Sequence, residues 1–153
     1  MTRILVFSDS HDTVEHMEKT VENMIGVDYI FHLGDHSKDA RYLELIFPEK
    51  KHYYVRGNCD FCAPEPIDYT LEIDGFTFYL THGHEYGVKT RMTELRGYAE
   101  KNGIDCVLYG HTHIAECEKI GNVLYLNPGS AKESAGVLEI EEGEIKGCTF
   151  KII

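Results

Sequence analysis

Short apolar segments alternate with helical segments in the first half of the chain, and this alternation constrains the fold more than any other feature. Three apolar segments, each typical of a buried strand, cover residues 3–8, 28–33 and 52–55. Hydrophobic residues recur at helical spacing over 13–25, and a shorter helix is expected over 38–47. This order favours parallel strands joined by crossover helices.

The second half of the chain is richer in hairpins. Dipeptides that favour tight turns are Asp74-Gly75, Gly121-Asn122 and Glu142-Gly143. The strands expected on either side are residues 69–73 and 76–80, 114–119 and 123–126, and 136–140 and 145–151. One more helix is expected over 90–101 and one more strand over 105–109. We therefore predict one α/β domain over residues 1–153, a layered sandwich of two sheets with flanking helices.

The composition narrows the classes of partner. Fifteen Lys and Arg face 26 Asp and Glu, and the resulting formal charge of -11 opposes non-specific binding to nucleic acids. A phosphorylated substrate stays open, because bound cations can invert the local field.

Residues 4–7 are apolar but Asp9 follows closely, which favours a strand over a signal peptide, and no apolar run approaches the roughly 20 residues of a membrane span. Five scattered cysteines favour reduced thiols, so we expect a cytoplasmic protein without membrane contact.

Residue types that bind metals follow five of the predicted strands. The segments are Asp9-Ser10-His11, Gly34-Asp35, Gly57-Asn58-Cys59-Asp60, Thr81-His82-Gly83-His84 and Gly110-His111-Thr112-His113. Ligands of open α/β sheets bind beyond the carboxyl ends of the strands, so these side chains are expected to converge on one crevice. The glycines before Asp35, Asn58 and His111 are expected to permit tight backbone turns there.

The residue types suit a centre of two divalent cations. Two such ions about 3.5–4 Å apart can share a carboxylate and a hydroxide, and Asp35 is a natural bridge because a carboxylate has two oxygens. Asp9 and His11 are two residues apart, which would place them on one side of an extended segment, and His111 and His113 repeat this spacing. Asn58 would add a neutral oxygen ligand, which limits the negative charge of the site.

Taken in this order, the motifs Asp-x-His, Gly-Asp, Gly-Asn-x-Asp, His-Gly-His and Gly-His-x-His resemble those of the calcineurin-like metallophosphoesterases, most closely the YfcE-like small phosphodiesterases. The resemblance extends to the segment Asn127-Pro128-Gly129-Ser130. It implies a metallophosphoesterase sandwich and a phosphodiesterase or phosphatase that uses a hydroxide bridging two divalent metals. The metals could be Mn, Ni, Fe, Co or Zn, with Mn favoured.

The resemblance also implies a ligand set for each metal. The first metal would be bound by Asp9, His11, Asp35 and His113, and the second by Asp35, Asn58, His82 and His111. Larger members of the superfamily have a histidine after the Gly-Asn pair that is thought to aid phosphate binding or protonate the leaving group. Cys59 occupies that position here, so the identity of any general acid stays open.

Three residues are candidates for a direct role in catalysis, namely Asn58, Cys59 and His84. His84 could contact the substrate, contact a metal-bound water or orient His82. Asp60 is expected to support its neighbours rather than to bind a metal.

Two function classes fit the sequence. The first is hydrolysis of a small phosphate ester. The second is a catalytically weak protein-binding scaffold of the same fold, like the retromer subunit Vps29. A scaffold can lose metal ligands without penalty, whereas all seven expected ligands are present in this sequence. The physiological substrate, the preference for mono- or diesters, the native metal and homo-oligomerisation are left open.

Overall fold

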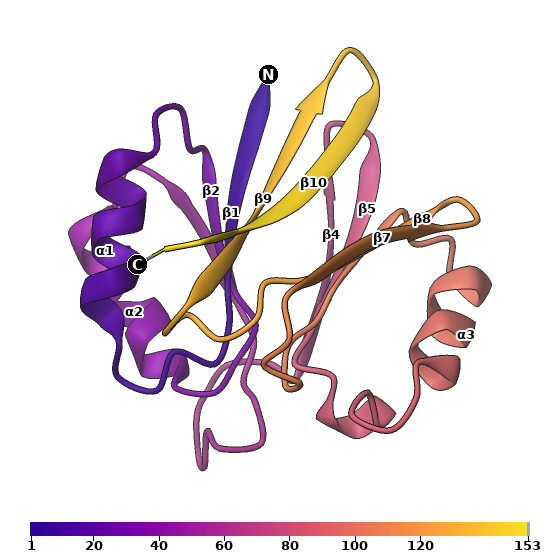
Figure 1. The fold of residues 1–153 in the computed structure, drawn as a ribbon, viewed down its shortest axis with the longest axis horizontal. Helices are drawn as coiled ribbons and strands as arrows, with labels where there is room; N and C mark the ends of the chain where they lie inside the picture. The colour runs from indigo at the N-terminus through magenta and orange to yellow at the C-terminus, as the bar shows by residue number, and fades with distance from the viewer. Residues whose placement is uncertain (153) are drawn as a thin grey trace.

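Two five-stranded sheets face each other in the computed structural model, which describes residues 1–152 (Figure 1). The first sheet has the strand order β10-β9-β1-β2-β3. Its strands are β1 (Thr2–Phe7), β2 (Tyr29–His32), β3 (Lys51–Tyr54), β9 (Ser134–Glu141) and β10 (Glu144–Lys151). β1, β2 and β3 run parallel to one another, while the β9–β10 hairpin joins β1 in the antiparallel sense.

The second sheet has the strand order β4-β5-β6-β8-β7. Its strands are β4 (Asp68–Ile73), β5 (Phe76–Thr81), β6 (Cys106–Leu108), β7 (Glu116–Ile120) and β8 (Val123–Asn127). The central strands β5, β6 and β8 are parallel, and each edge strand belongs to a hairpin. Parallel strands therefore lie in both sheets, which brings two sets of strand ends to one side of the molecule.

Helices cover the outer faces of the sandwich. α1 (Val14–Asn23) and α2 (Ser37–Ile46) lie against the first sheet, and α3 (Thr93–Lys101) lies on the side of the second sheet (Figure 1). A short 3-10 helix, η1 (His84–Tyr86), precedes α3. Among residues 1–152, none of the helices combines the length and the hydrophobicity that crossing a bilayer requires.

Side-chain alternation along β1 explains how the layers are held together. Ile4 and Val6 enter the core between the two sheets, while Leu5 and Phe7 enter the core under α1 and α2. All four side chains are fully buried, as expected for a parallel strand that is covered on both faces. The strand is thus a shared wall of two cores, and its carboxyl end is fixed in position.

The predicted α/β sandwich with flanking helices is confirmed, with differences at the ends of elements. The third helix begins at Thr93 instead of residue 90, because a run of turns follows η1, a helix that the sequence did not predict. β1 ends at Phe7 instead of residue 8, and β6 spans Cys106–Leu108 instead of 105–109. Beyond Phe7, the carbonyl oxygen of Ser8 accepts a hydrogen bond from the N–H of Ala131, outside the strands.

The contact between the sheets can be tested at Phe78. Its ring meets the ring of Phe31 in the facing sheet edge-on, with centroids 6.4 Å apart. Phe78→Ala is expected to lower the free energy of unfolding by about 3–5 kcal/mol, because a fully buried ring leaves a cavity. Urea denaturation measures this loss. Phe61→Ala is the control, because Phe61 is exposed and its truncation should change stability little; equal losses would contradict the assignment of the core.

Candidate metal centre

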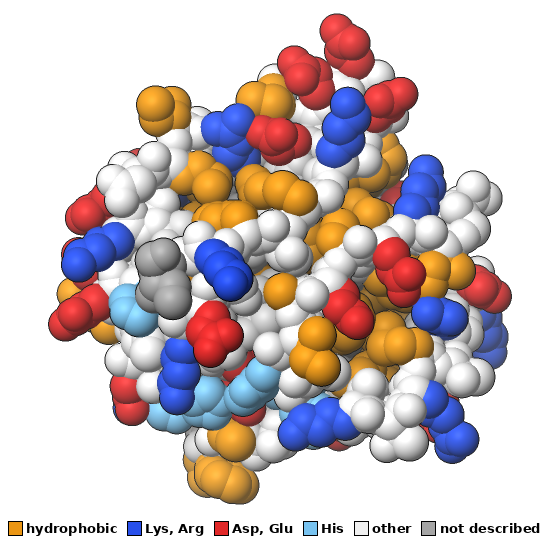
Figure 2. Space-filling view, in the orientation of Figure 1, with side chains coloured by type: hydrophobic (Ala, Val, Ile, Leu, Met, Phe, Trp, Pro, Cys, Tyr) orange, Lys and Arg blue, Asp and Glu red, His pale blue; other side chains and the backbone are white. Residues whose placement is uncertain are grey.

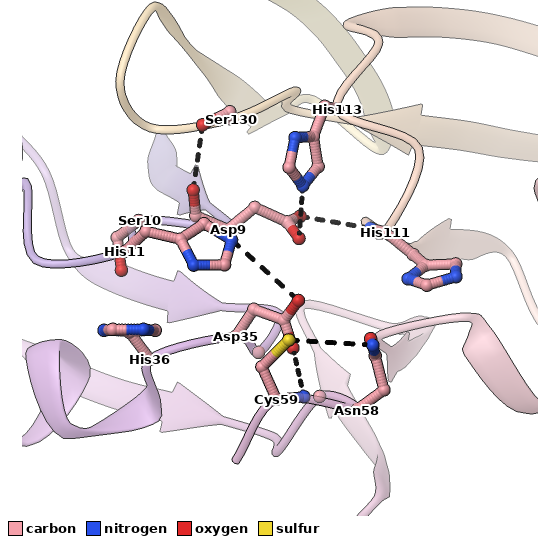
Figure 3. Close-up of polar contacts among 12 residues, drawn as sticks. Asp9, Ser10, His11, Asp35, His36, Asn58, Cys59, His111, His113 and Ser130 are labelled. Atoms are coloured by element: carbon pink, nitrogen blue, oxygen red, sulfur yellow. Dashed lines mark hydrogen bonds and ion pairs between the residues drawn. The ribbon is translucent and has the colours of Figure 1, made fainter.

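The side chains that follow the parallel strands converge at one end of the sandwich (Figure 3). Asp9 follows β1, Asp35 follows β2 and Asn58 follows β3, all from the first sheet. The second sheet contributes His82 after β5, and His111 and His113 after β6. Hydrogen bonds join the two sets, since the backbone N–H of His111 donates to Oδ2 of Asp9 over 3.1 Å.

The sequence predicted an extended backbone at this end, but the structure shows turns instead. Positive φ values occur at Asp9 (51°), His11 (44°), Asp35 (59°), His111 (71°) and His113 (63°). Left-handed backbone is uncommon outside glycine and is held only where surrounding contacts enforce it. The expectation that spacing in an extended segment aligns Asp9 with His11 was therefore wrong, because turns bring the two side chains together.

Two overlapping groups of ligand atoms lie in this cluster. In the first group, atoms of Asp9, His11 and His113 lie within 4.8 Å of one another, with Nε2 of His113 3.1 Å from Oδ1 of Asp9. In the second, atoms of Asp9, Asp35 and His82 meet the same limit. Asp9 is therefore common to both groups.

Asp35 lies between imidazoles of the two groups. Its Oδ2 is 3.4 Å from Nε2 of His82 and 4.0 Å from Nε2 of His11. Its Oδ1 accepts a hydrogen bond from the backbone N–H of Cys59 over 2.9 Å. Burial acts to raise the pKa of Asp35, but the hydrogen bonds from His82 and Cys59 outweigh it and hold the pKa well below its ordinary value. Asp35 is thus a carboxylate in the folded chain.

A hydrogen bond to the backbone fixes the orientation of the His82 ring. Its Nδ1 lies 2.8 Å from the carbonyl oxygen of Leu33, so it carries the proton and donates it there. Nε2 then faces Asp35 and is the ring nitrogen that remains for a metal, as in metal-binding histidines. Nδ1 of His111 lies 3.2 Å from this Nε2. Burial lowers the pKa of His111 to about 4, which leaves that imidazole neutral at neutral pH.

The donor set fits divalent cations. Asp9 is 0% and Asp35 3% exposed, and within the part of the chain that the structure describes their only ion-pair partners are histidines. Buried carboxylates are costly unless a cation compensates them. Carboxylate oxygens and imidazole nitrogens together are ligands for first-row divalent metals, so these residues could hold such ions.

The three candidate catalytic residues border the cluster. Nδ2 of exposed Asn58 lies 3.7 Å from Sγ of Cys59, a weak contact. Burial and then the charge of Asp35 raise the pKa of Cys59, which keeps it a thiol. His84 lies on η1 with its ring 5.5 Å from that of His82, and its buried Nδ1 has no hydrogen-bond partner among the described residues.

Asp60 organises the loops that carry Asp35 and Asn58. Its carboxylate accepts hydrogen bonds from the backbone N–H groups of Asp35, His36, Ser37 and Gly57, at 2.7–3.0 Å. Four charge-assisted bonds in one place fix the positive-φ turn at Asp35. The side chain supports its neighbours, and it belongs to neither of the ligand groups around Asp9.

Two serines outside the expected ligand set support Asp9, a role that the sequence did not predict. The hydroxyl of Ser8 donates to Oδ2 of Asp9 over 2.6 Å, and the hydroxyl of Ser130 donates to its carbonyl oxygen over 2.9 Å. Ser130 is separated from Asp9 by 121 positions, so no local pattern could have revealed the contact. Its place in the motif Asn127-Pro128-Gly129-Ser130 was the one available signal.

The three glycines of the loops serve two purposes. Gly34 has a φ of 100° and makes the expected turn. Gly57 and Gly110 do not have positive φ, so a tight turn does not explain why glycine occupies these two positions. A Cβ on Gly57 would lie 2.2 Å from Oδ1 of Asp35, and one on Gly110 would lie 2.1 Å from Oγ of Ser8. These two glycines leave room for the carboxylates.

A family model describes almost the whole chain. Residues 2–142 match the calcineurin-like phosphoesterase superfamily domain. The chain belongs to the calcineurin-like phosphoesterase superfamily. The resemblance inferred from the motifs is confirmed, and the members it resembles include YfcE, as expected.

Three curated relatives of this superfamily carry enzyme names. The chain is 31% identical over 146 residues to the probable metallophosphoesterase YsnB of Bacillus subtilis, covering 90% of this chain and 84% of that one. It is 29% identical to the phosphodiesterase MJ0936 of Methanocaldococcus jannaschii (94% and 96% covered). It is 28% identical to the phosphodiesterase YfcE of Escherichia coli (100% and 92% covered).

Solved structures share the fold. A Streptococcus pneumoniae protein described as a predicted phosphoesterase superimposes with a TM-score of 0.81 at 28% identity, covering 98% of this chain and 89% of that one. The zinc complex of Vps29 from Entamoeba histolytica superimposes with a TM-score of 0.77 at 20% identity, covering 99% and 100%. At that identity the second likeness shows the fold alone.

The close packing at Gly57 yields a test of the cluster. Gly57→Ala is expected to weaken metal binding about 10- to 100-fold, because the new methyl group displaces Oδ1 of Asp35. Calorimetric titration with Mn²⁺ measures the affinity.

The matched control is Gly97→Ala, where nothing lies within 4 Å of the added methyl group. Gly97 is inside α3, so alanine there should leave metal affinity unchanged and favour the helix. Unchanged affinity in Gly57→Ala would show that Asp35 is not a ligand.

Proposed function

We propose that this chain is a phosphodiesterase that hydrolyses small phosphate esters at a centre of two divalent cations, with manganese favoured. One observation carries the proposal, namely the two overlapping groups of carboxylate and imidazole atoms that share Asp9 at the end of β1. Family membership supports a phosphoester substrate, and relatives named as phosphodiesterases support a diester.

In this proposal each cation takes ligands from both sheets. Asp9, His11, Asp35 and His113 would hold the first cation, and Asp35, Asn58, His82 and His111 the second. The position of Asp35 Oδ2 between Nε2 of His82 and Nε2 of His11 supports a bridging role for this carboxylate. Asn58, which is exposed, would supply its amide oxygen.

The bound cations would lower the pKa of a water to about 7 and neutralise charge on the phosphoryl oxygens. The residues around them complete the site. The ring of His84 lies 5.5 Å from that of His82, which places this residue at the border of the cluster, where it would contact the substrate. Cys59 remains a thiol next to Asp35, so it is placed to contact the substrate and poorly suited to attack it.

Paired substitutions test the role of Asp35. Asp35→Asn keeps the shape of the side chain and removes the charge, and it should lower kcat/KM for bis(p-nitrophenyl) phosphate at least about a hundredfold. Cys59→Ser, in the adjacent loop, should lower it less than about tenfold. Metal content measured on both variants links the loss to the cations. Near-normal turnover of Asp35→Asn at full metal occupancy would exclude a bridging carboxylate.

The origin of the attacking oxygen gives a second test. We expect water to attack phosphorus directly, because the pKa of the one thiol in the site is raised. A single turnover in isotopically labelled water should therefore place the label in the phosphate product, as mass spectrometry would show. An unlabelled product in the first turnover, or a trapped phospho-cysteine or phospho-serine, would defeat this mechanism.

The same fold in Vps29 keeps a scaffold function as the competing hypothesis. A screen of phosphomonoesters and phosphodiesters against Mn, Ni, Fe, Co and Zn separates the two. Hydrolysis that depends on metal and on Asp35 supports the enzyme. Absence of hydrolysis with all five metals, in protein that binds them, would support the scaffold.

A further inference from the structure

A second feature lies directly beside the proposed metal centre. A cavity of about 320 Å³ opens between the start of α2 and the loop from β3 to β4. Among its lining residues are His36, Lys38, Arg41, Cys59 and Phe61. Two of these connect it to the centre, because the ring of His36 lies 4.9 Å from that of His11 and the N–H of Cys59 bonds to Asp35. Its volume is at the small end of the about 300–1,000 Å³ typical of ligand pockets.

Phe61 is the feature of this cavity that the fold does not explain. Its ring is 87% exposed, so it contributes almost nothing to the hydrophobic cores. In Figure 1 the loop that carries it projects beyond the ends of the strands, and in Figure 2 hydrophobic side chains lie at that edge next to the histidines. A solvent-exposed aromatic ring at the rim of a cavity offers a face on which a planar group of a ligand can stack.

The loop that presents Phe61 is anchored on both sides of the ring. Asp60 accepts four backbone N–H groups, as described above. After the ring, the buried carboxylate of Glu65 pairs with Arg41, and the N–H of Arg56 donates to the carbonyl oxygen of Pro66. The backbone on both sides of Phe61 is therefore held in place, which keeps the residue at the edge of the cavity.

The charges around the cavity indicate what it can hold. Nζ of Lys38 lies 3.1 Å from Asp12, and Arg41 pairs with Glu65. The carboxylate of Asp60 is occupied by backbone N–H groups. Lys38 and Arg41 each already pair with a carboxylate. The two side chains therefore offer hydrogen-bond donors at the rim of the cavity, and their charges are compensated. The cavity suits a neutral group with polar edges better than a second phosphate.

We propose that this cavity binds one ester group of the substrate, and that this group is a flat, uncharged ring of the nucleoside type. Phe61 stacks on the ring, and Lys38 and Arg41 donate to acceptors on its edge. The proposal rests on the proposed function, because the phosphate must lie at the metal centre for the ring to reach the cavity. Stacking on an aromatic side chain is tolerant of ring identity, so recognition would extend over several bases.

Direct binding tests the proposal independently of turnover. Calorimetry on the manganese-loaded protein compares thymidine 5′-monophosphate with inorganic phosphate, which differ by the nucleoside. We expect the nucleotide to bind about tenfold more tightly or better, and Phe61→Ala to remove most of this difference. Phe61→Tyr should retain it, because a ring remains. Ile25→Ala is the matched control, since Ile25 is 86% exposed and lines a different cavity, near the C-terminus.

Each outcome bears on one hypothesis. Equal affinity for the two ligands in the wild-type protein, or an unchanged difference in Phe61→Ala, overturns the subsite while hydrolysis of bis(p-nitrophenyl) phosphate still tests the proposed function. If hydrolysis fails with every metal, the proposed function fails, and the calorimetric comparison still decides whether the ring binds beside Phe61. A loss of the difference in Ile25→Ala as well would also overturn the assignment to Phe61.

Discussion

The burial of Asp9 is the constraint on which the site depends. Its carboxylate is at the end of a strand that both cores enclose, and water does not reach it. A bare carboxylate in such a place is costly, and the chain places His82 and His113 against it, with no lysine or arginine paired to it among residues 1–152. Imidazoles beside buried carboxylates form a donor set in which bound divalent cations would complete the compensation of charge.

The positions of the strands explain why the chain could be understood largely from its sequence. Apolar runs and turn dipeptides carry the periodicity of the sandwich, and each parallel strand ends at the same side. Residues directly after β1, β2 and β5 could therefore be predicted to meet, and Asp9, Asp35 and His82 do meet. Family membership then follows from the order of the motifs, because that order reflects the order of the strands.

Other features depend on contacts that a linear pattern does not encode. The left-handed turn at Asp9 is held by hydrogen bonds with Ser130 and Gly34, and the N–H of His111 bonds to Asp9; all these partners are distant in the sequence. The close packing at Gly57 is a question of space, which no propensity scale contains. The start of α3 was misplaced because turns continue after η1 and Gly87, and no breaker separates residue 90 from Thr93, where the helix begins.

Both sheets contribute side chains to the cluster, and this has a consequence for the sandwich as a whole. Asp9 and Asp35 belong to one layer, whereas His82, His111 and His113 belong to the other. The cluster therefore lies at the interface between the two sheets. The distance between its atoms depends on how far apart the hydrophobic core holds the sheets. A substitution in this core, at Phe31 or Phe78, would alter the distance between the side chains of the two sheets without contacting the cluster itself. The packing of the apolar core thus determines the distances within the polar site.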